Sequence, residues 1–158
     1  MPNGYWFKGM KILDLLREKA RPVHTIASNQ SIDDAVNLLS EKRVSALIVT
    51  ENGQPVGIFA ERDVFRFYLR ERTRALSETA LHNAMTNKLI VAEPEDEVSQ
   101  VMAIMIKSDI KHLPVVKAKK ILGMLTLNDL IEHQIDSLNQ EIHQLKDYID
   151  DLHDAGID

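Results

Sequence analysis

The sequence predicts a mixed α+β protein made of two copies of one small β-α-β-β-α unit, followed by a C-terminal amphipathic helix. The first observation is an internal repeat, because residues 24–64 align without a gap on residues 90–130. The second is a glycine followed six residues later by an aspartate in both copies: Gly57 and Asp63, then Gly123 and Asp129. The third is hydrophobic periodicity, which alternates between strand-like and helix-like spacing in the same order in each copy.

Each element of the first copy follows from its residues. A β-rich run at 22–26 precedes apolar residues at helical spacing within 31–43, and Ser31 is suited to cap that helix. The continuous apolar run at 46–50 predicts a strand that is buried on both faces. The Asn-Gly pair after it predicts a hairpin whose return strand covers 56–60 and leads into a second helix.

The second copy repeats this series and sets the domain boundaries. Its predicted strands cover 89–93, 113–116 and 121–126, and its first helix lies within 96–108. One unit alone exposes an apolar sheet face, so we expect the two copies to pack about a pseudo-twofold axis. The predicted segments are a tail, repeat 1, a connector, repeat 2 and an association helix: 1–9, 10–70, 71–80, 81–134 and 135–158.

The composition excludes several classes of protein. The 158 residues are 44% hydrophobic and carry a formal net charge of −5, which argues against the basic surface of a nucleic-acid-binding protein. The absence of cysteine excludes disulfides and thiolate metal sites. No apolar run approaches the roughly 20 residues that span a bilayer, and the N-terminal residues lack a signal-peptide pattern. We therefore expect a cytoplasmic protein.

Motifs for catalysis or metal binding are absent from the sequence. It contains no G-x-S-x-G elbow, P-loop or G-x-G-x-x-G motif. The six histidines do not show metal-ligand spacing such as H-E-x-x-H. We expect neither an enzyme nor a metal site.

The duplicated motif, with glycine followed by aspartate at the end of each copy, resembles that of tandem cystathionine-β-synthase-type (CBS) domains, also called the Bateman module. IKHLPVV at 110–116 resembles a strand of that family, and ERD at 61–63 is similar to stand-alone bacterial members. The resemblance covers Met10 to Gln134. It implies a non-catalytic module that binds an adenosine nucleotide between its repeats, AMP before ATP or ADP, and signals to a client protein by conformational change.

The resemblance also implies roles for individual residues. Asp63 and Asp129 match the aspartates that accept hydrogen bonds from ribose hydroxyls, and a carboxylate suits a diol because it can accept two O–H donors. The residues that match phosphate-contacting positions are Thr126, Arg62, Lys111 and His112. The region that reads adenine corresponds to Thr25, Ile26, Ile90, Val91 and Ala46.

Two departures from the family pattern predict unequal sites. Ala60 stands where Thr126 stands in the second copy, so the first copy lacks the hydroxyl that would contact a phosphate. One hydrogen bond to a charged group contributes roughly 1.5–3 kcal/mol, which is enough to distinguish twin sites. Lys111 replaces the usual arginine and loses its bidentate geometry. Arg62 could compensate in the first site.

Other interpretations stay open. An aspartate that follows a strand commonly does no more than cap a helix, and His112 could be a half-buried strand residue. The module could also be a ligand-free homodimeric scaffold. NAD or S-adenosylmethionine could replace the nucleotide as the sensed ligand.

The C-terminal segment predicts association with a partner. Its apolar residues recur at alternating steps of three and four, as in a coiled-coil seam. A single helix would leave this stripe in water, so we expect a homodimer, although a higher oligomer or docking onto its own domain is possible. The acidic polar face argues against membrane binding. The association residues are Ile135, Leu138, Ile142, Leu145, Ile149 and Leu152.

Overall fold

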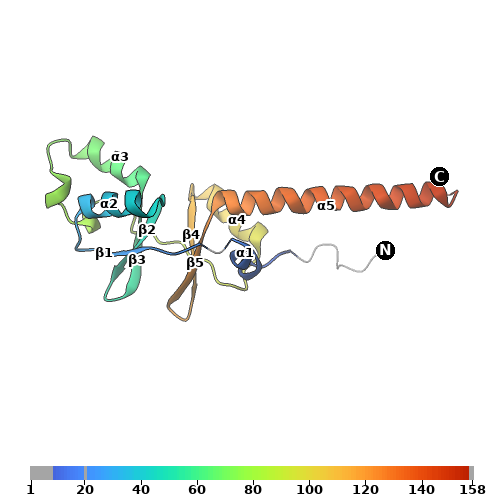
Figure 1. The fold of residues 1–158 in the computed structure, drawn as a ribbon, viewed down its shortest axis with the longest axis horizontal. Helices are drawn as coiled ribbons and strands as arrows, with labels where there is room; N and C mark the ends of the chain where they lie inside the picture. Colours follow the sequence, from blue (N-terminus) through green and yellow to red (C-terminus); the bar gives the residue numbers. More distant parts are fainter. Residues whose placement is uncertain (1–8, 20, 157–158) are drawn as a thin grey trace.

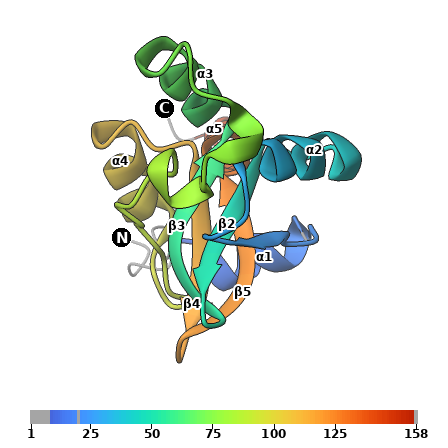
Figure 2. The same cartoon turned by 90° about the vertical axis from the view of Figure 1, so that its left-hand side faces the viewer.

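The structure, a computed structural model, describes residues 9–19 and 21–156, which form two α+β repeats and one long projecting helix (Figure 1). The predicted N-terminal tail lies outside the described residues except for Gly9. Figure 2 looks at the molecule from the side of the first repeat, and the hairpins of the two repeats lie next to each other in both views. The two predicted repeats are confirmed.

The first repeat is a three-stranded sheet with two helices. β1 pairs parallel with β2, and β2 pairs antiparallel with β3. This is the predicted β-α-β-β-α order. Its elements are β1 (Thr25–Ala27), α2 (Ile32–Lys42), β2 (Ala46–Glu51), β3 (Gln54–Ala60) and α3 (Glu61–Arg70).

The second repeat contains only a two-stranded hairpin, so the strand predicted over 89–93 is wrong. In that segment Ala92 alone pairs, in an isolated parallel bridge to Val115. In the first repeat the Ser28 N–H continues the pairing by donating to the Thr50 carbonyl at 2.9 Å. The equivalent residue is Pro94, which has no N–H to donate. The elements of this repeat are α4 (Val98–Lys107), β4 (His112–Lys117), β5 (Lys120–Thr126) and α5 (Leu127–Asp154).

The two hairpins share one register, which is direct structural support for the duplication. Val49 lies opposite Gly57 and Val115 lies opposite Gly123, and a bulge follows each pair. This register places Ala46 opposite Ala60 and His112 opposite Thr126. The ends of both hairpins therefore bring the predicted site residues to one side of the molecule.

Each repeat has its own hydrophobic core, and the N-terminal helix α1 (Ile12–Glu18) packs in the core of the second. Ile12 and Leu15 are fully buried there, although our boundaries place them at the start of the first repeat. The polar connector contains the short 3-10 helix η2 (Leu76–Glu78), and a second one, η3 (Leu81–Asn83), follows it directly.

α5 joins the last helix of the second repeat to the predicted association helix in one element of 28 residues. Its C-terminal half extends beyond the body of the molecule (Figure 1). Five of the six predicted association residues are exposed by 49–60%, and Leu152 is half-buried. No helix in the described ranges combines the length and apolar character that a bilayer span requires.

Candidate functional site

Asp63 and Asp129 occupy the same position in the two repeats, the third residue of the helix that follows each hairpin. Both are buried, with 4% and 2% exposure. The backbone N–H groups of Ala60 and Thr126 donate to Oδ2 of Asp63 and Asp129 at 2.8 Å each. The Thr126 hydroxyl also accepts the Asp129 N–H at 3.2 Å, which completes a capping box. Both aspartates therefore do cap helices, and the Thr126 hydroxyl keeps its proton for a further partner.

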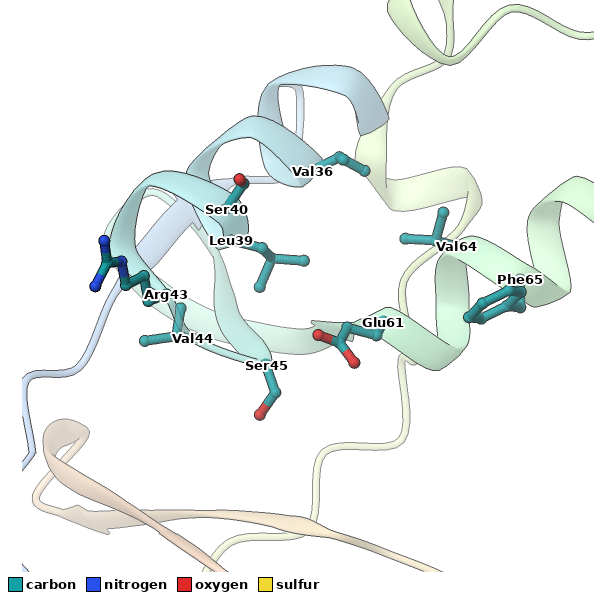
Figure 3. Close-up of a pocket in the computed structure, with 9 residues that line it drawn as sticks. All are labelled: Val36, Leu39, Ser40, Arg43, Val44, Ser45, Glu61, Val64 and Phe65. Atoms are coloured by element: carbon teal, nitrogen blue, oxygen red, sulfur yellow. The ribbon is translucent and has the colours of Figure 1, made fainter.

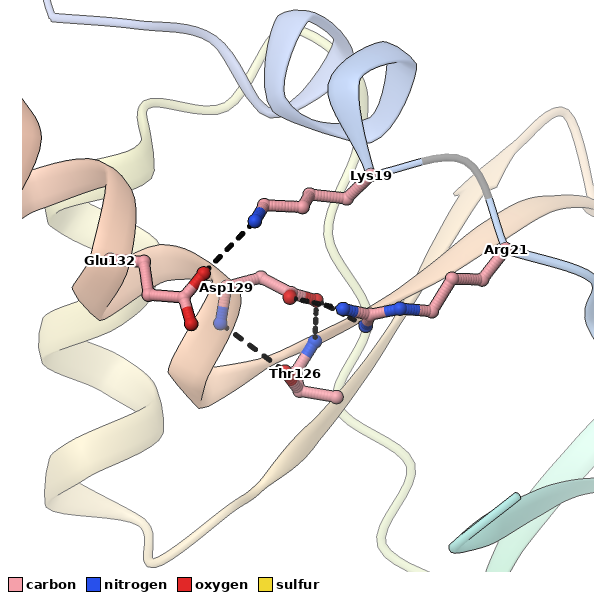
Figure 4. A network of polar contacts seen from close by, with 5 residues as sticks. All are labelled: Lys19, Arg21, Thr126, Asp129 and Glu132. Carbon is pink, nitrogen blue, oxygen red and sulfur yellow. Dashed lines mark hydrogen bonds and ion pairs between the residues drawn. The ribbon is translucent and has the colours of Figure 1, made fainter. Parts of the chain in front are cut away.

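Arg21 forms an ion pair with the carboxylate of Asp129 (Figure 4). Its Nη1 and Nη2 atoms donate to Oδ2 and Oδ1 of Asp129 at 2.6 Å each, forming a bidentate ion pair. Arg21 lies between α1 and β1, close in sequence to Lys19, which donates to Glu132 of α5 at 2.9 Å. Two cations of this segment are thus tied to the beginning of α5.

The pKa of Asp129 lies below its ordinary value although the residue is buried. Burial favours the neutral acid and acts to raise the pKa, but the hydrogen bonds from Arg21 and from the Thr126 backbone outweigh it. The hydrogen bond to Asp129 raises the pKa of Arg21 in turn. Asp129 is therefore an anion at neutral pH and can accept O–H donors.

Asp63 is held by a neutral partner from the corresponding part of the chain. The Thr86 hydroxyl donates to Asp63 Oδ1 at 2.9 Å. Thr86 comes shortly before the segment 89–93 of the second repeat, as Arg21 comes shortly before β1 of the first, so each aspartate is bound by the initial segment of the other repeat. The partner of Asp63 is a neutral hydroxyl, whereas the partner of Asp129 is a positively charged guanidinium. The surroundings of the two aspartates therefore differ in charge, in addition to the difference between Ala60 and Thr126.

The four predicted phosphate residues line one cavity of about 410 Å³ between the repeats: Thr126, Arg62, Lys111 and His112. Pairs of residues related by the duplication occur together in its wall, such as Ala60 with Thr126 and Arg62 with Asn128. The cavity therefore lies where the two repeats meet. Arg62 is partly engaged there, because its guanidinium donates to the Asp109 carboxylate at 3.0 Å and to the Asp109 carbonyl at 3.2 Å.

A second cavity of about 570 Å³ is lined by Asp129 and adjoins the first. The two cavities share Ser45, His112, Thr126 and Asn128. Ala46, predicted for the adenine region, also lines the second cavity, together with the basic residues Arg21, Lys42 and Arg43. Asp129 and the four residues predicted to contact phosphate thus line adjoining cavities.

His112 joins the two repeats and carries a depressed pKa. Its Nε2 atom lies 2.8 Å from Oγ of Ser45 in the first repeat. Burial lowers the pKa of His112, and the positive charges of Arg62 and Lys111 lower it further. The imidazole is therefore neutral at pH 7.

The other residues predicted for the adenine region lie outside this cavity. Ile26 and Ile90 pack in or against the cores of their own repeats, while Thr25 and Val91 are exposed. Pro22 and His24, just before β1, line the cavity instead. The adenine assignment of Thr25, Ile26, Ile90 and Val91 stays a prediction.

A larger cavity of about 740 Å³ lies between α2 and α3 of the first repeat and shares Arg43, Val44 and Ser45 with the cavity beside Asp129 (Figure 3). Figure 3 shows Val36 and Leu39 of α2 on one side of it and Val64 and Phe65 of α3 on the other. Among the described residues that line it, none belongs to the predicted ribose or phosphate set.

Sequence reasoning missed Arg21, Ser45 and Asn128. The duplication relates Ser45 to Lys111 and Asn128 to Arg62, so the 66-residue offset could have identified both. Arg21 had no such signal, because it lies in an irregular segment before the aligned region.

Comparison with known proteins identifies the family. The model of the CBS domain matches residues 14–70 and 80–136, so the chain belongs to the CBS-domain family and carries two such domains in tandem. It is 29% identical to the CBS domain-containing protein CBSX3, mitochondrial, of Arabidopsis thaliana, across 90% of this chain and 73% of that protein. The CBS-domain containing protein ATU1752 from Agrobacterium tumefaciens is 27% identical, with a TM-score of 0.73 over 79% of this chain and 99% of that one.

Two solved structures of similar fold contain adenosine compounds. The CBS domain pair of protein MJ0100, in complex with 5-methylthioadenosine and S-adenosyl-L-methionine, is 25% identical with a TM-score of 0.67 over 78% of this chain and 94% of that one. The CBS domain protein PAE2072 from Pyrobaculum aerophilum, complexed with AMP, has a TM-score of 0.66 over 76% of this chain and 89% of that one. Its 22% identity shows the shared fold alone.

Proposed function

We propose that this chain is a regulatory module without catalytic activity that binds an adenosine nucleotide in the cavity beside Asp129, with AMP the first candidate and ADP or ATP next. The observation that carries the proposal is that two adjoining cavities between the repeats share four lining residues. A buried, ionised carboxylate suited to a ribose diol lies in one, and four residues suited to a phosphate lie in the other. The adenosine compounds bound to MJ0100 support the ligand class.

The proposed site uses Asp129 rather than Asp63. Thr126 can offer its hydroxyl proton to a phosphate, whereas the equivalent Ala60 has no donor in its side chain. Lys42 and Arg43 also line the cavity beside Asp129, and their positive charges favour an anionic ligand. We expect the Asp63 position to bind more weakly.

Signalling would begin at α5, since Thr126 and Asp129 form both the proposed ligand site and the N-terminal cap of that helix. A ligand that changes the bonds of this cap would alter the start of a helix that extends to Asp154. If this changes the affinity for a client protein, the client must change the affinity for the ligand by the same factor.

A ligand-free homodimeric scaffold is the second candidate, and one observation favours it. The carboxylates of Asp63 and Asp129 already accept hydrogen bonds from Thr86 and Arg21, so neither lacks partners in the free protein. In both candidates the exposed apolar stripe of α5 would be covered by a second copy of the chain.

Calorimetric titration of the full chain with AMP, ADP, ATP, NAD and S-adenosylmethionine separates the two candidates. We expect binding of AMP, weakened more by Asp129→Asn than by Asp63→Asn, with thermal unfolding used to show that both variants fold. No heat and no thermal shift with any of the five compounds would leave the scaffold as the function. If Asp63→Asn lowers the affinity for AMP more than Asp129→Asn does, the ligand binds beside Asp63.

A further inference from the structure

The apolar stripe of α5 has the residue types of a particular coiled coil. A step of three leads from position a to position d of a heptad, and a step of four leads from d to the next a. The stripe therefore has isoleucine at every a position and leucine at the d positions that follow: Ile135, Ile142 and Ile149, with Leu138, Leu145 and Leu152. Isoleucine at a combined with leucine at d favours two parallel strands.

The flanking charges favour the same arrangement. In a parallel, in-register pair, residue g of one helix faces residue e of the next heptad in the partner. Glu141 is at position g and Lys146 is the next e, so opposite charges would meet twice in a symmetric dimer. An antiparallel pair would place e beside e and g beside g, and it would lose this contact.

The structure leaves this surface open. Every residue from Ile142 to Asp151 is exposed, and the corresponding part of α5 lies beyond the body of the molecule (Figure 1). The 20 residues from Ile135 to Asp154 span about 30 Å, enough for nearly three heptads. A helix of this length with a wet apolar stripe is marginal without a partner.

We propose that α5 forms a parallel, in-register, two-stranded coiled coil with α5 of a second copy of this chain. The proposal rests on the association through α5 proposed above and adds its strand number, direction and register. Both copies of the cavity beside Asp129 would then lie at the same end of the shared stalk, because each α5 begins at its own Thr126 cap.

The chain has no cysteine, so a single introduced cysteine gives a clean test of direction. In the proposed dimer the two copies of residue 152 face each other, within the span of a disulfide. We expect Leu152→Cys to form a disulfide-linked dimer under mild oxidation, detected on a non-reducing gel. Gln140→Cys, at outward position f of the same helix, is the matched control and should stay unlinked.

Charge exchange tests the register. Glu141→Lys should weaken the dimer severalfold at low salt by placing like charges together, and adding Lys146→Glu should restore it. Light scattering and sedimentation of the full chain measure the effect. A monomeric wild-type chain would overturn association through α5 altogether. A wild-type dimer in which I135C pairs with L152C, while L152C alone stays unlinked, would overturn only the parallel arrangement.

Discussion

Replacing Arg21 with alanine should tighten AMP binding. Arg21 donates hydrogen bonds to the Asp129 carboxylate, which would otherwise be available to the ribose hydroxyls. The pair has two hydrogen bonds of 2.6 Å to an Asp129 side chain that is 3% exposed. Hydrogen bonds to charged groups contribute about 1.5–3 kcal/mol. The Arg21 side chain is 48% exposed, so solvent reduces this contribution to about 1 kcal/mol. Removing the competing pair should therefore raise affinity by about fivefold.

Calorimetry with AMP and adenosine measures the effect, and Lys19→Ala is the matched control. Lys19 pairs with Glu132 in the same segment without a hydrogen bond to Asp129, so its removal should leave AMP affinity nearly unchanged. We expect Arg21→Ala to tighten both ligands by a similar factor, since each carries the same ribose. Weaker AMP binding, with adenosine unaffected, would refute the reasoning and show that Arg21 contacts the phosphate.

Three further predictions concern His112, Asp129 and the two hairpin glycines. Burial lowers the pKa of His112, and a bound phosphate would raise it, so AMP binding should take up a proton and strengthen as the pH falls from 7.5 towards 6. Asp129→Asn should lower the free energy of unfolding by about 1–3 kcal/mol at pH 7. Because the pKa of Asp129 is depressed in the folded state, this difference should be present above about pH 4 and shrink as the pH falls through the native pKa. Gly57→Ala should lower the free energy of unfolding by about 1–3 kcal/mol, because its Cβ would lie 2.7 Å from the Thr86 carbonyl oxygen. Gly123→Ala should lower it less, because its Cβ would meet only the flexible side chain of Leu16.

Each of these has a simple contrary outcome. His112→Ala should flatten the pH dependence of AMP binding measured by calorimetry, and an unchanged slope would assign the proton to another group. For Asp129→Asn, urea unfolding should show a larger loss of unfolding free energy at pH 7 than at pH 3. Equal losses at the two pH values would mean that the charge of Asp129 does not contribute to stability. Equal destabilisation of the two glycine variants in urea would mean that the backbone at Thr86 yields as easily as a side chain.

The repeat made most of the fold predictable, since the same periodicity occurs in both copies and predicted five strands and four helices that the structure contains. The wrong strand at 89–93 has a local cause, because Pro94 lacks the N–H that Ser28 uses in the first copy. Helix α1 was not predicted, because its burial depends on a core made by residues some 80 to 120 positions away in the chain. At the site, the duplication related the two aspartates to each other and the family resemblance indicated the four phosphate residues, whose roles stay predictions. The ion pair between Arg21 and Asp129 could not be predicted, because a contact between residues 108 positions apart leaves no periodic signal in the sequence.

The continuity of α5 turns a small local change into a large displacement. The helix has no break between its cap and Asp154, and its 28 residues span about 42 Å. A tilt of about 10° at the first turn would move the far end on the order of 7 Å over that length. A rigid rod of this kind acts as a lever, so a small shift of α5 against α1 and α4 near Thr126 would become a much larger displacement at its tip.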